Sequence, residues 1–333
     1  MNPSVSIVIP MYNAERHIKD VLQAIFTQDY SAPIEVMVVN DGSTDNSLEI
    51  VKEFQQTDNV KIIDQPNQGA VIATNNGFKA VRYDIVCSVD SDVVLHKDWL
   101  HKIMEEFDNS SVGAVQGYIK TPEGVSFLAR MAGYDLEYRY DRLKSKYVTQ
   151  VSTANTAYKR SALEKAGLFN PKFKYGYDND MSYRLQKAGY KLVFQKAALC
   201  YHYWKVDLKG YIKQQYWSAY GRMQLIQKHK ERIIGDSVSG LRMILQVPLT
   251  LLFFILFILG IVFILFSPLG RYFLLAASGV LGIILVDRFA FAFGIFKKQN
   301  DPTVFVLPFV HLLRNMVWCW AFLKWGMGLK WVK

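Results

Sequence analysis

The segment from Ile244 to Phe266 carries no charged residue over 23 consecutive positions. At about 1.5 Å per residue, a helix of this length crosses a hydrocarbon layer about 30 Å thick. A buried helix of a water-soluble domain is the alternative interpretation, and the length of the uncharged run counts against it. The segment therefore predicts a membrane span, and it limits the chain to folds that include a membrane region.

Two further apolar segments follow the first. Phe273 to Phe296 is interrupted only by Asp287 and Arg288, which are neighbours and can pair with each other or face protein. Val304 to Leu329 is less uniform, so it predicts either a third span or a helix along the membrane surface. Its charged and titratable residues are His311, Arg314 and Lys324.

The Lys and Arg residues around these segments predict an orientation. Lys297 and Lys298 follow the second segment, whereas the link "SPLGRY" before it contains a single Arg. The positive-inside rule therefore places the link outside the cell and the N-terminal region in the cytoplasm. A spanning third segment would carry Lys324, Lys330 and Lys333 to the outer side, against this rule, so we favour a surface-lying or re-entrant helix.

Charge is unevenly distributed along the 333 residues, whose formal net charge is +10. Residues 1–100 contain 7 Lys plus Arg against 14 Asp plus Glu, whereas residues 201–333 contain 16 against 5. A basic region can bind nucleic acid or an anionic membrane. Because residues 206–242 combine Tyr, Trp, Lys and Arg immediately before the first span, we expect interfacial helices on lipid and no nucleic-acid partner.

The N-terminal region has no signal-peptide pattern, because Met1 to Ser4 is short and polar and the apolar run after it ends at Pro10. Cys87, Cys200 and Cys319 have neither metal-ligand nor disulfide spacing. Both observations fit a region that stays in a reducing compartment, on the side of the membrane where it is made.

Short apolar runs alternate with helical patterns over the first two hundred residues. The runs are almost continuously apolar, as expected for parallel strands that are covered on both faces. Between the first two runs, apolar residues recur at helical spacing after Asn13, a suitable N-cap. This βαβ order predicts an α/β domain with a parallel sheet and right-handed crossovers. The expected strands are Val5–Ile9, Ile34–Val39, Val60–Ile63 and Ile85–Val89.

Polar clusters follow three of these strands: "PMYN" the first, "NDGSTD" the second and "DSD" the fourth. In parallel sheets, ligands bind beyond the carboxyl ends of the strands. Taken alone, Asn40 to Asp45 is a turn that caps the next helix, and Asp90 and Asp92 are a strand end and a cap. Alternation along the strand is expected to point Asp90 and Asp92 to the same side. If all three clusters lie at one edge of the sheet, they predict a site for a hard divalent cation that carries phosphate.

The order and spacing of "VSIVIPMYN", "VVNDGSTDNS", "NQGAVIATNNG" and "VDSD" resemble those of the family-2 glycosyltransferases with the GT-A fold. The resemblance extends over residues 4–205. It implies a nucleotide-diphospho-sugar transferase fold, that is, a mixed, mainly parallel sheet with flanking helices. The expected parts are a cytoplasmic GT-A catalytic domain at 1–205, interfacial helices at 206–242 and a membrane region at 243–333, with spans at 244–266 and 273–296 and a third span or interfacial helix at 304–329.

The resemblance implies a nucleotide-diphosphate sugar as donor, with UDP or GDP as the nucleotide. Asp41 is implied to accept a hydrogen bond from the base, Pro10 and Tyr12 to form the platform around the nucleotide, and the range Asn67 to Gly69 to line the donor pocket. One departure is Thr74, which stands where relatives often carry Arg, so one cationic contact with the donor is missing. The implied nucleotide-sugar-binding residues are Pro10, Tyr12, Asn13, Asp41, Asn67, Gly69, Asp90 and Ser91.

The same resemblance implies a divalent metal, Mg²⁺ or Mn²⁺, that bridges the diphosphate of the donor. Asp92 is the implied direct ligand, and Asp90 is implied to contact ribose or metal-bound water. His202, in "CYHYW", stands where many relatives place a histidine that completes the metal shell, although a histidine between aromatic residues is more often structural. The implied metal-binding residues are Asp90, Asp92 and His202.

The second half of the resembling region implies the acceptor side. Asp178 aligns with the Asp of the family's "ED" element and is the implied general base, although Tyr177 replaces the usual Glu before it. Asn155 is implied to contact the acceptor or the donor sugar, with a structural role as the equal alternative. Asp180 is a second acceptor-side candidate, but a carboxylate at the start of a helix also serves the helix dipole or pairs with Arg184 at i+4.

These observations predict a multi-pass enzyme of the cell membrane. It is expected to be a metal-dependent, inverting glycosyltransferase that moves one sugar to a membrane-held acceptor, polyprenyl phosphate or a glycolipid. A processive polysaccharide synthase is the first alternative, and the lack of a Q-X-X-R-W element counts against it. A non-catalytic nucleotide-sugar-binding membrane subunit is the second, disfavoured by the retention of Asp90, Asp92 and Asp178. The few spans and the lack of a repeat disfavour a channel or transporter.

Overall fold

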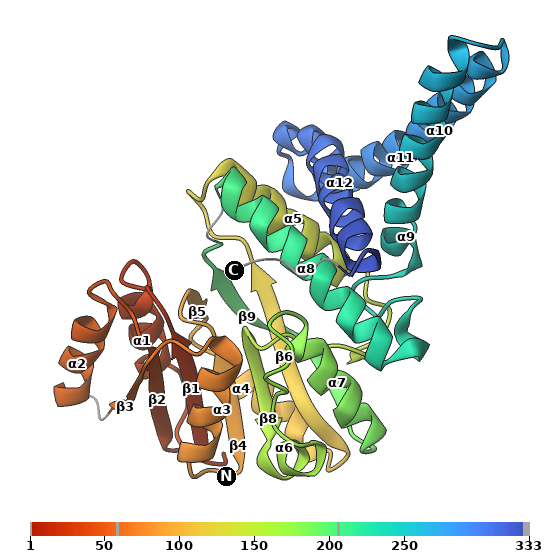
Figure 1. Cartoon of the computed structure of the whole chain (residues 1–333). Helices are drawn as coiled ribbons and strands as arrows, with labels where there is room; N and C mark the ends of the chain where they lie inside the picture. The colour runs from red at the N-terminus through yellow and green to blue at the C-terminus, as the bar shows by residue number, and fades with distance from the viewer. Residues whose placement is uncertain (1, 58–59, 205–206, 329–333) are drawn as a thin grey trace. The chain divides into compact units, whose positions relative to one another are not determined.

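The computed structural model describes residues 2–57, 60–204 and 207–328. Contacts divide the chain into two compact units, Met1–Lys205 and Val206–Lys333, which we call the N-terminal and the C-terminal unit. Strands belong to the first unit, and the described part of the second consists of helices and their connections (Figure 1).

The four apolar runs of the sequence are confirmed as strands. They are β1 (Val5–Met11), β2 (Ile34–Asp41), β3 (Val60–Gln65) and β4 (Ile85–Val89). β1 pairs in parallel with both β2 and β4, and β2 pairs in parallel with β3. This half of the sheet is therefore parallel, as the βαβ order predicts.

Five further strands extend this half into a mixed sheet. They are β5 (Val93–Leu95), β6 (Val112–Lys120), β7 (Tyr147–Val148), β8 (Asn155–Lys159) and β9 (Lys191–His202). Among the described residues the order is β3-β2-β1-β4-β8-β6-β9-β5, with β7 beside β9. β8 runs antiparallel to β4 and β6, whereas β6 and β9 are parallel. β1 to β4, β6 and β9 thus direct their carboxyl ends to one edge of the sheet, where β8 begins.

Helices flank the sheet (Figure 1). They are α1 (Ile18–Phe26), α2 (Ser47–Thr57), α3 (Ala70–Ala80), α4 (Trp99–Met104), the 3-10 helix η1 (Glu105–Asp108), α5 (Phe127–Asp141), α6 (Arg160–Ala166) and α7 (Tyr177–Lys187). In α1, the buried Ile18, Val21 and Leu22 lie at helical spacing and form an apolar face. α3 approaches the sheet at Gly77, where a Cβ atom would lie 2.3 Å from Val8 Cγ1.

The N-cap predicted at Asn13 is wrong. α1 begins at Ile18 after His17, and Asn13 has a left-handed backbone with a φ of 51°. Its side-chain oxygen accepts a hydrogen bond from Thr44 N at 2.8 Å, and its own N–H donates to Ser43 Oγ at 3.0 Å. Asn13 therefore joins the loop after β1 to the loop after β2 instead of capping a helix.

The C-terminal unit contains three described helical segments that are long and apolar enough to cross a membrane: Leu241–Ile264, Leu269–Gln299 and Pro302–Gly326. The helices of this unit are α8 (Leu208–Lys228), η2 (Lys230–Arg232), α9 (Leu241–Ile244), α10 (Gln246–Ile264), α11 (Leu269–Gln299), η3 (Pro302–Val306) and α12 (Leu307–Gly326).

The third apolar segment differs from the other two in its packing. In its most apolar stretch 50% of the helix is buried by protein, compared with 17% and 22% for the first and second segments. α12 lies beside α8, where Tyr216 and Ala219 form a buried cluster with Val317 and Ala321 (Figure 1). A protein surface therefore covers much of the third segment, whereas the first two present most of their apolar side chains outward.

Candidate active site

The polar clusters of the sequence reach one edge of the sheet. β1 leads into Tyr12 and Asn13, β2 ends with Asp41, β4 leads into Asp90, and β9 ends with His202. The strand directions place all of these residues at the carboxyl edge. This edge is where ligands bind in open α/β sheets, so it is the candidate active site.

Asp92 and His202 are neighbours at this edge. β5 pairs with the end of β9, so that Val93 lies opposite His202. As a result, Asp92 Oδ1 lies 3.3 Å from His202 Nε2. The imidazole is 8% exposed and packs on the indole of Trp204, with ring centroids 3.8 Å apart. The motif alone did not indicate this supporting role of Trp204.

Carboxylates crowd the same edge. The pKa of Asp90 is raised to about 7, first by burial and then by the carboxylate of Asp92; His202 opposes the rise, and Asp178 adds to it. Asp90 is therefore within electrostatic reach of both Asp92 and Asp178, although Asp178 belongs to α7. Carboxylates this close repel one another, and a divalent cation between them relieves that repulsion.

Asp92 and His202 can supply part of the ligand shell of such a cation. β4 ends at Val89, and Val93 N donates to Asp90 O at 3.1 Å in a tight turn, so the strand alternation expected for Asp90 and Asp92 does not apply. Within residues 2–57, 60–204 and 207–328, no three His, Cys, Asp or Glu side chains form a ready metal-binding group. Asp92 and His202 are the pair in place. Such a pair suits Mg²⁺ or Mn²⁺, which also take ligands from a diphosphate and water.

Asp41 organises the loop that is expected to line the donor pocket. It is 2% exposed, and its carboxylate accepts hydrogen bonds from the N–H groups of Gln68 and Gly69 at 2.9 and 2.8 Å. Gly42 has a φ of 72°, and a Cβ atom there would lie 2.9 Å from Asn67 N. The motifs "NDGS" and "NQG" therefore pack directly against each other, and Asp41 holds them together.

The other predicted donor contacts differ in exposure. Tyr12 is 48% exposed, and Pro10 and Ser91 are half-buried, so these three present surface at the edge. Thr74, which replaces the family's Arg, has no exposed surface, and its Oγ1 donates to Ala70 O at 2.8 Å within α3. The side chain of Thr74 is therefore used inside the helix.

Asn155 has no exposed surface. It lies opposite Val89 in the β4–β8 pair, and its Nδ2 donates to Cys200 Sγ at 2.9 Å. Contact with a sugar requires an accessible side chain, so the structure supports the structural alternative for Asn155 over the substrate contact.

Asp178 occupies the first turn of α7, after Gly176, whose φ of 74° is left-handed. The carbonyl of Asp178 accepts a hydrogen bond from Ser182 Oγ at 2.8 Å, and Ser182 Oγ itself accepts one from Val151 N at 3.0 Å. These bonds fix the helix start to the chain before β8. The carboxylate of Asp178 accepts a hydrogen bond from Asn179 N at 2.8 Å, and its charge contributes to the raised pKa of Asp90.

Tyr177 stands where relatives carry a second carboxylate. Its hydroxyl lies 3.3 Å from Thr153 Oγ1, and its ring meets Phe169 edge-on with centroids 5.6 Å apart. Burial raises the pKa of this phenol, and the carboxylate of Asp90 contributes to the rise. The phenol therefore stays protonated and places a neutral hydrogen-bonding group beside the acidic cluster.

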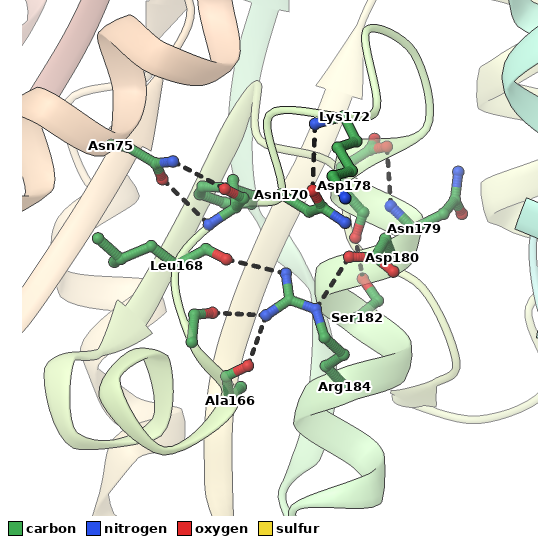
Figure 2. Close-up of polar contacts among 12 residues, drawn as sticks. Asn75, Ala166, Leu168, Asn170, Lys172, Asp178, Asn179, Asp180, Ser182 and Arg184 are labelled. Atoms are coloured by element: carbon green, nitrogen blue, oxygen red, sulfur yellow. Dashed lines mark hydrogen bonds and ion pairs between the residues drawn. The ribbon is translucent and has the colours of Figure 1, made fainter. Parts of the chain in front are cut away.

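Asp180 is fully buried and pairs with Arg184, with 2.9 Å between Oδ2 and Nε. The i+4 contact expected from the sequence is confirmed, and the acceptor-side role of Asp180 is disfavoured because its carboxylate is not accessible. The same guanidinium donates to three successive carbonyls at the end of α6 (Figure 2). These are the carbonyls of Ala166, Gly167 and Leu168, at 2.5, 2.6 and 3.0 Å. We call this arrangement the Arg184 clamp.

Asn75 holds the next residue of the same turn. Its Nδ2 donates to Phe169 O at 2.7 Å, and its Oδ1 accepts from Phe169 N at 3.0 Å (Figure 2). Asn75 lies on α3, whose N-cap is Gly69, so the turn connects the helix of the donor loop with the start of α7. Of these contacts, sequence reasoning found only the i+4 spacing of Asp180 and Arg184.

Comparison with solved structures defines the fold. The mannosyltransferase PcManGT from Pyrobaculum calidifontis, in complex with GDP-Man and Mn²⁺, has a TM-score of 0.62 and 18% identity, covering 96% of this chain and 88% of its own. S. aureus TarS 1-349 has a TM-score of 0.50 and 19% identity, covering 99% and 93%. The N-terminal unit therefore has the GT-A fold of nucleotide-diphospho-sugar transferases.

Residues 6–167, just under half of the chain, match the family model described as Glycosyl transferase family 2. Curated relatives include the poly-beta-1,6-N-acetyl-D-glucosamine synthases of Staphylococcus epidermidis and Staphylococcus aureus (strain COL), which are 26% and 25% identical over 231 residues. The aligned region is 67% of this chain and 56% of each synthase. The chain thus matches little more than half the length of these relatives.

Arg184→Gln is expected to loosen the Arg184 clamp and to leave the buried carboxylate of Asp180 without this counter-ion. Removing one partner of a buried ion pair destabilises a protein by about 3–5 kcal/mol. Hydrogen exchange of the purified chain should therefore become faster in residues 166–187. Lys187→Gln changes an exposed residue of the same helix and should leave exchange unaltered. Equal exchange in both variants would contradict the clamp.

Proposed function

We propose that this chain is a membrane-bound glycosyltransferase that moves a sugar from a nucleotide-diphosphate donor to an acceptor held at the membrane. The observation that carries the proposal is the gathering of Asp90, Asp92, Asp178 and His202 at the carboxyl edge of a family-2 domain. Helices apolar enough to span a membrane follow this domain in the chain, which supports a membrane-held acceptor.

An inverting displacement suits this group of residues. The acceptor oxygen gives its proton to the Asp178 carboxylate and forms a bond to the anomeric carbon; the bond from that carbon to the diphosphate oxygen breaks, and the diphosphate leaves with the electron pair. A divalent cation, when bound, neutralises charge on the departing diphosphate. Asp92 and His202 are proposed to hold that cation, with Asp90 beside them.

UDP- or GDP-sugars are the proposed donors, with Asp41 and the loop from Asn67 to Gly69 on the base and ribose side. The printed GDP-Man and Mn²⁺ of PcManGT support a nucleotide sugar and a divalent metal on this fold. A panel of nucleotide sugars offered to the purified full chain, with nucleoside diphosphate release as the readout, tests the proposal. Release from none of them, with or without membrane lipid, would favour a non-catalytic binding subunit.

Polyprenyl phosphate or a glycolipid is the proposed acceptor, and a single transfer is the proposed outcome. Polysaccharide synthesis is the second candidate, because the curated relatives are named as synthases of a polymer. The two functions differ in the product. Mass spectrometry of the lipid extract shows one added sugar per acceptor for single transfer and a ladder of lengths for polymerisation.

We further propose that the N-terminal unit faces the cytoplasm, that the first two apolar segments cross the membrane, and that the third lies along its surface. The packing of α12 on α8 and the greater burial of the third segment support the last point. The cationic residues Lys297 and Lys298 support the orientation. Lys330 and Lys333, which the charge argument also used, lie outside the described residues.

Removal of divalent metal is expected to abolish nucleoside diphosphate release, and added Mg²⁺ or Mn²⁺ should restore it. Asp92→Ala should abolish turnover with the fold intact, whereas His202→Ala should weaken it, because other ligands of the cation remain. Asp20→Ala, an exposed change in α1, is the control for loss of a carboxylate. Full activity in excess chelator would exclude a metal requirement.

Asp178→Asn is expected to lower kcat by at least about a hundredfold with a hydroxyl acceptor, because an amide keeps the shape of the carboxylate but does not accept the proton. KM for the nucleotide sugar should change little. A mild effect would indicate an acceptor that is already ionised, such as a phosphate. Full rate with a demonstrated hydroxyl acceptor would show that Asp178 is not the base.

Cysteine labelling tests the topology. Ser267→Cys, in the link between the first two spans, should react with an impermeant thiol reagent on intact cells. Met327→Cys, at the end of the third segment, should react only after permeabilisation, and 61% exposure of Met327 makes it accessible then. Cys87, Cys200 and Cys319 are buried, so background labelling is low. Labelling of Met327→Cys on intact cells would mean that the third segment crosses.

A further inference from the structure

Polar side chains form one layer where the three apolar segments of the C-terminal unit meet. Charged and amide side chains are expensive in hydrocarbon, so inside membrane regions they pair with one another and mark functional sites. The layer draws on all three segments. Its members are Arg242 and Gln246 from the first, Asp287 and Arg288 from the second, and Arg314 and Asn315 from the third.

A single carboxylate in this layer serves two guanidinium groups. Asp287 Oδ1 accepts a hydrogen bond from Arg242 Nε, and Asp287 Oδ2 accepts one from Arg288 Nε at 2.8 Å. Arg288 is 4% exposed, whereas the side chain of Arg242 is 62% exposed. The three residues together carry one net positive charge, and Arg242 is the member that a ligand can reach.

Arg314 adds a third guanidinium group. Its Nη2 donates to Gln246 Oε1 at 2.7 Å, and Gln246 follows Arg242 by one helical turn, so the two share a helix face. Gln246 and Arg314 are 3% and 6% exposed. Among the described residues of the layer, three are Arg and one is a carboxylate, so positive charge is in excess.

The layer lies at the depth of lipid head groups. At about 1.5 Å per residue, Arg242 lies about 35 Å and Asp287 about 28 Å along their helices from the link at residues 265–268. These distances are close to the thickness of the hydrocarbon layer. If the link is at one surface of the bilayer and the second span ends near Asp287 instead of Phe296, the layer is at the other surface, where lipid phosphates are found.

We propose that this layer binds the phosphate of a membrane lipid, with Arg242 as the contact residue. In the described structure Arg242 donates to Asp287 through Nε. The two terminal amino groups of Arg242 can therefore donate to a further acceptor. A guanidinium group binds phosphate oxygens through paired charge-assisted hydrogen bonds. Buried Arg288 and Arg314 supply the positive potential behind it, as in basic pockets between membrane helices.

The phosphate can belong to an anionic phospholipid of the bilayer or to a phosphorylated lipid acceptor. Only the second source rests on the proposed glycosyl transfer. Direct binding therefore tests the site without the reaction, and it stays informative if the chain proves to have a different activity.

Native mass spectrometry of the purified full chain in detergent, titrated with phosphatidylglycerol, phosphatidylcholine or polyprenyl phosphate, tests the proposal. The chain should bind phosphatidylglycerol or polyprenyl phosphate in preference to phosphatidylcholine, and Arg242→Gln should weaken that binding by about tenfold. Arg242→Lys should retain part of it. Arg271→Gln, which removes an exposed Arg near the link, is the matched control and should bind like the unaltered chain.

Preference for phosphatidylglycerol alone would identify bilayer phospholipid as the source, and displacement of it by polyprenyl phosphate would identify the acceptor. Arg242→Gln keeps Asp287 paired with Arg288, so loss of the fold is not expected, and an unaltered far-ultraviolet circular dichroism spectrum checks this. Equal affinity for phosphatidylcholine, or equal lipid binding by Arg242→Gln and Arg271→Gln, would overturn the proposal.

Discussion

Parallel pairing of β1 with β2 and β4 determines where chemistry can occur in the N-terminal unit. Because these strands are buried on both faces, most of their side chains are apolar, and the polar clusters collect where the strands end. The buried Ser6 of β1 and Glu35 of β2 are exceptions, and they bond to each other. β9 runs in the same direction and brings His202 to within 3.3 Å of Asp92, although the two residues are far apart in the chain. Without this common direction, the motifs would be separate turns, and their charged side chains would not interact.

Two charged side chains, the buried Asp41 and the partly buried Arg184, then hold loops of the N-terminal unit. The carboxylate of Asp41 gathers N–H groups at the start of α3, and the guanidinium of Arg184 gathers carbonyls at the end of α6. A buried charge is costly unless hydrogen bonds satisfy it, so each loop geometry is coupled to the burial of one charge. Asn75 joins α3 to the turn held by Arg184. The start of α3 and the start of α7 are therefore parts of one hydrogen-bonded framework.

The sequence allowed prediction of the strands because a doubly covered strand is a continuous apolar run, and of the shared edge because parallel strands end together. Prediction was less successful where contacts from distant parts of the chain determine the role of a side chain. Asn13 suits an N-cap by residue type, yet it bonds to a neighbouring loop. For Asn155 and Asp180 the sequence left a substrate contact and a structural role open, and the bonds to Cys200 and Arg184 in the interior favour the structural role. Residue type indicates the available chemistry, whereas only the fold supplies the partner.

Hydropathy alone presents the third apolar segment as one more span, and the packing separates it from the first two. Arg314 lies near the middle of Pro302–Gly326 but bonds to Gln246, close to the beginning of the first span. A third span in register with the first would carry its middle to about 15 Å from the head groups, half the hydrocarbon thickness. The hydrogen bond and the packing on α8 therefore support the proposal that the third segment lies near the membrane surface. A helix in that position would contact both protein and lipid through apolar residues, and its arginine would reach the polar layer. Such contacts would account for an apolar composition that approaches that of a span.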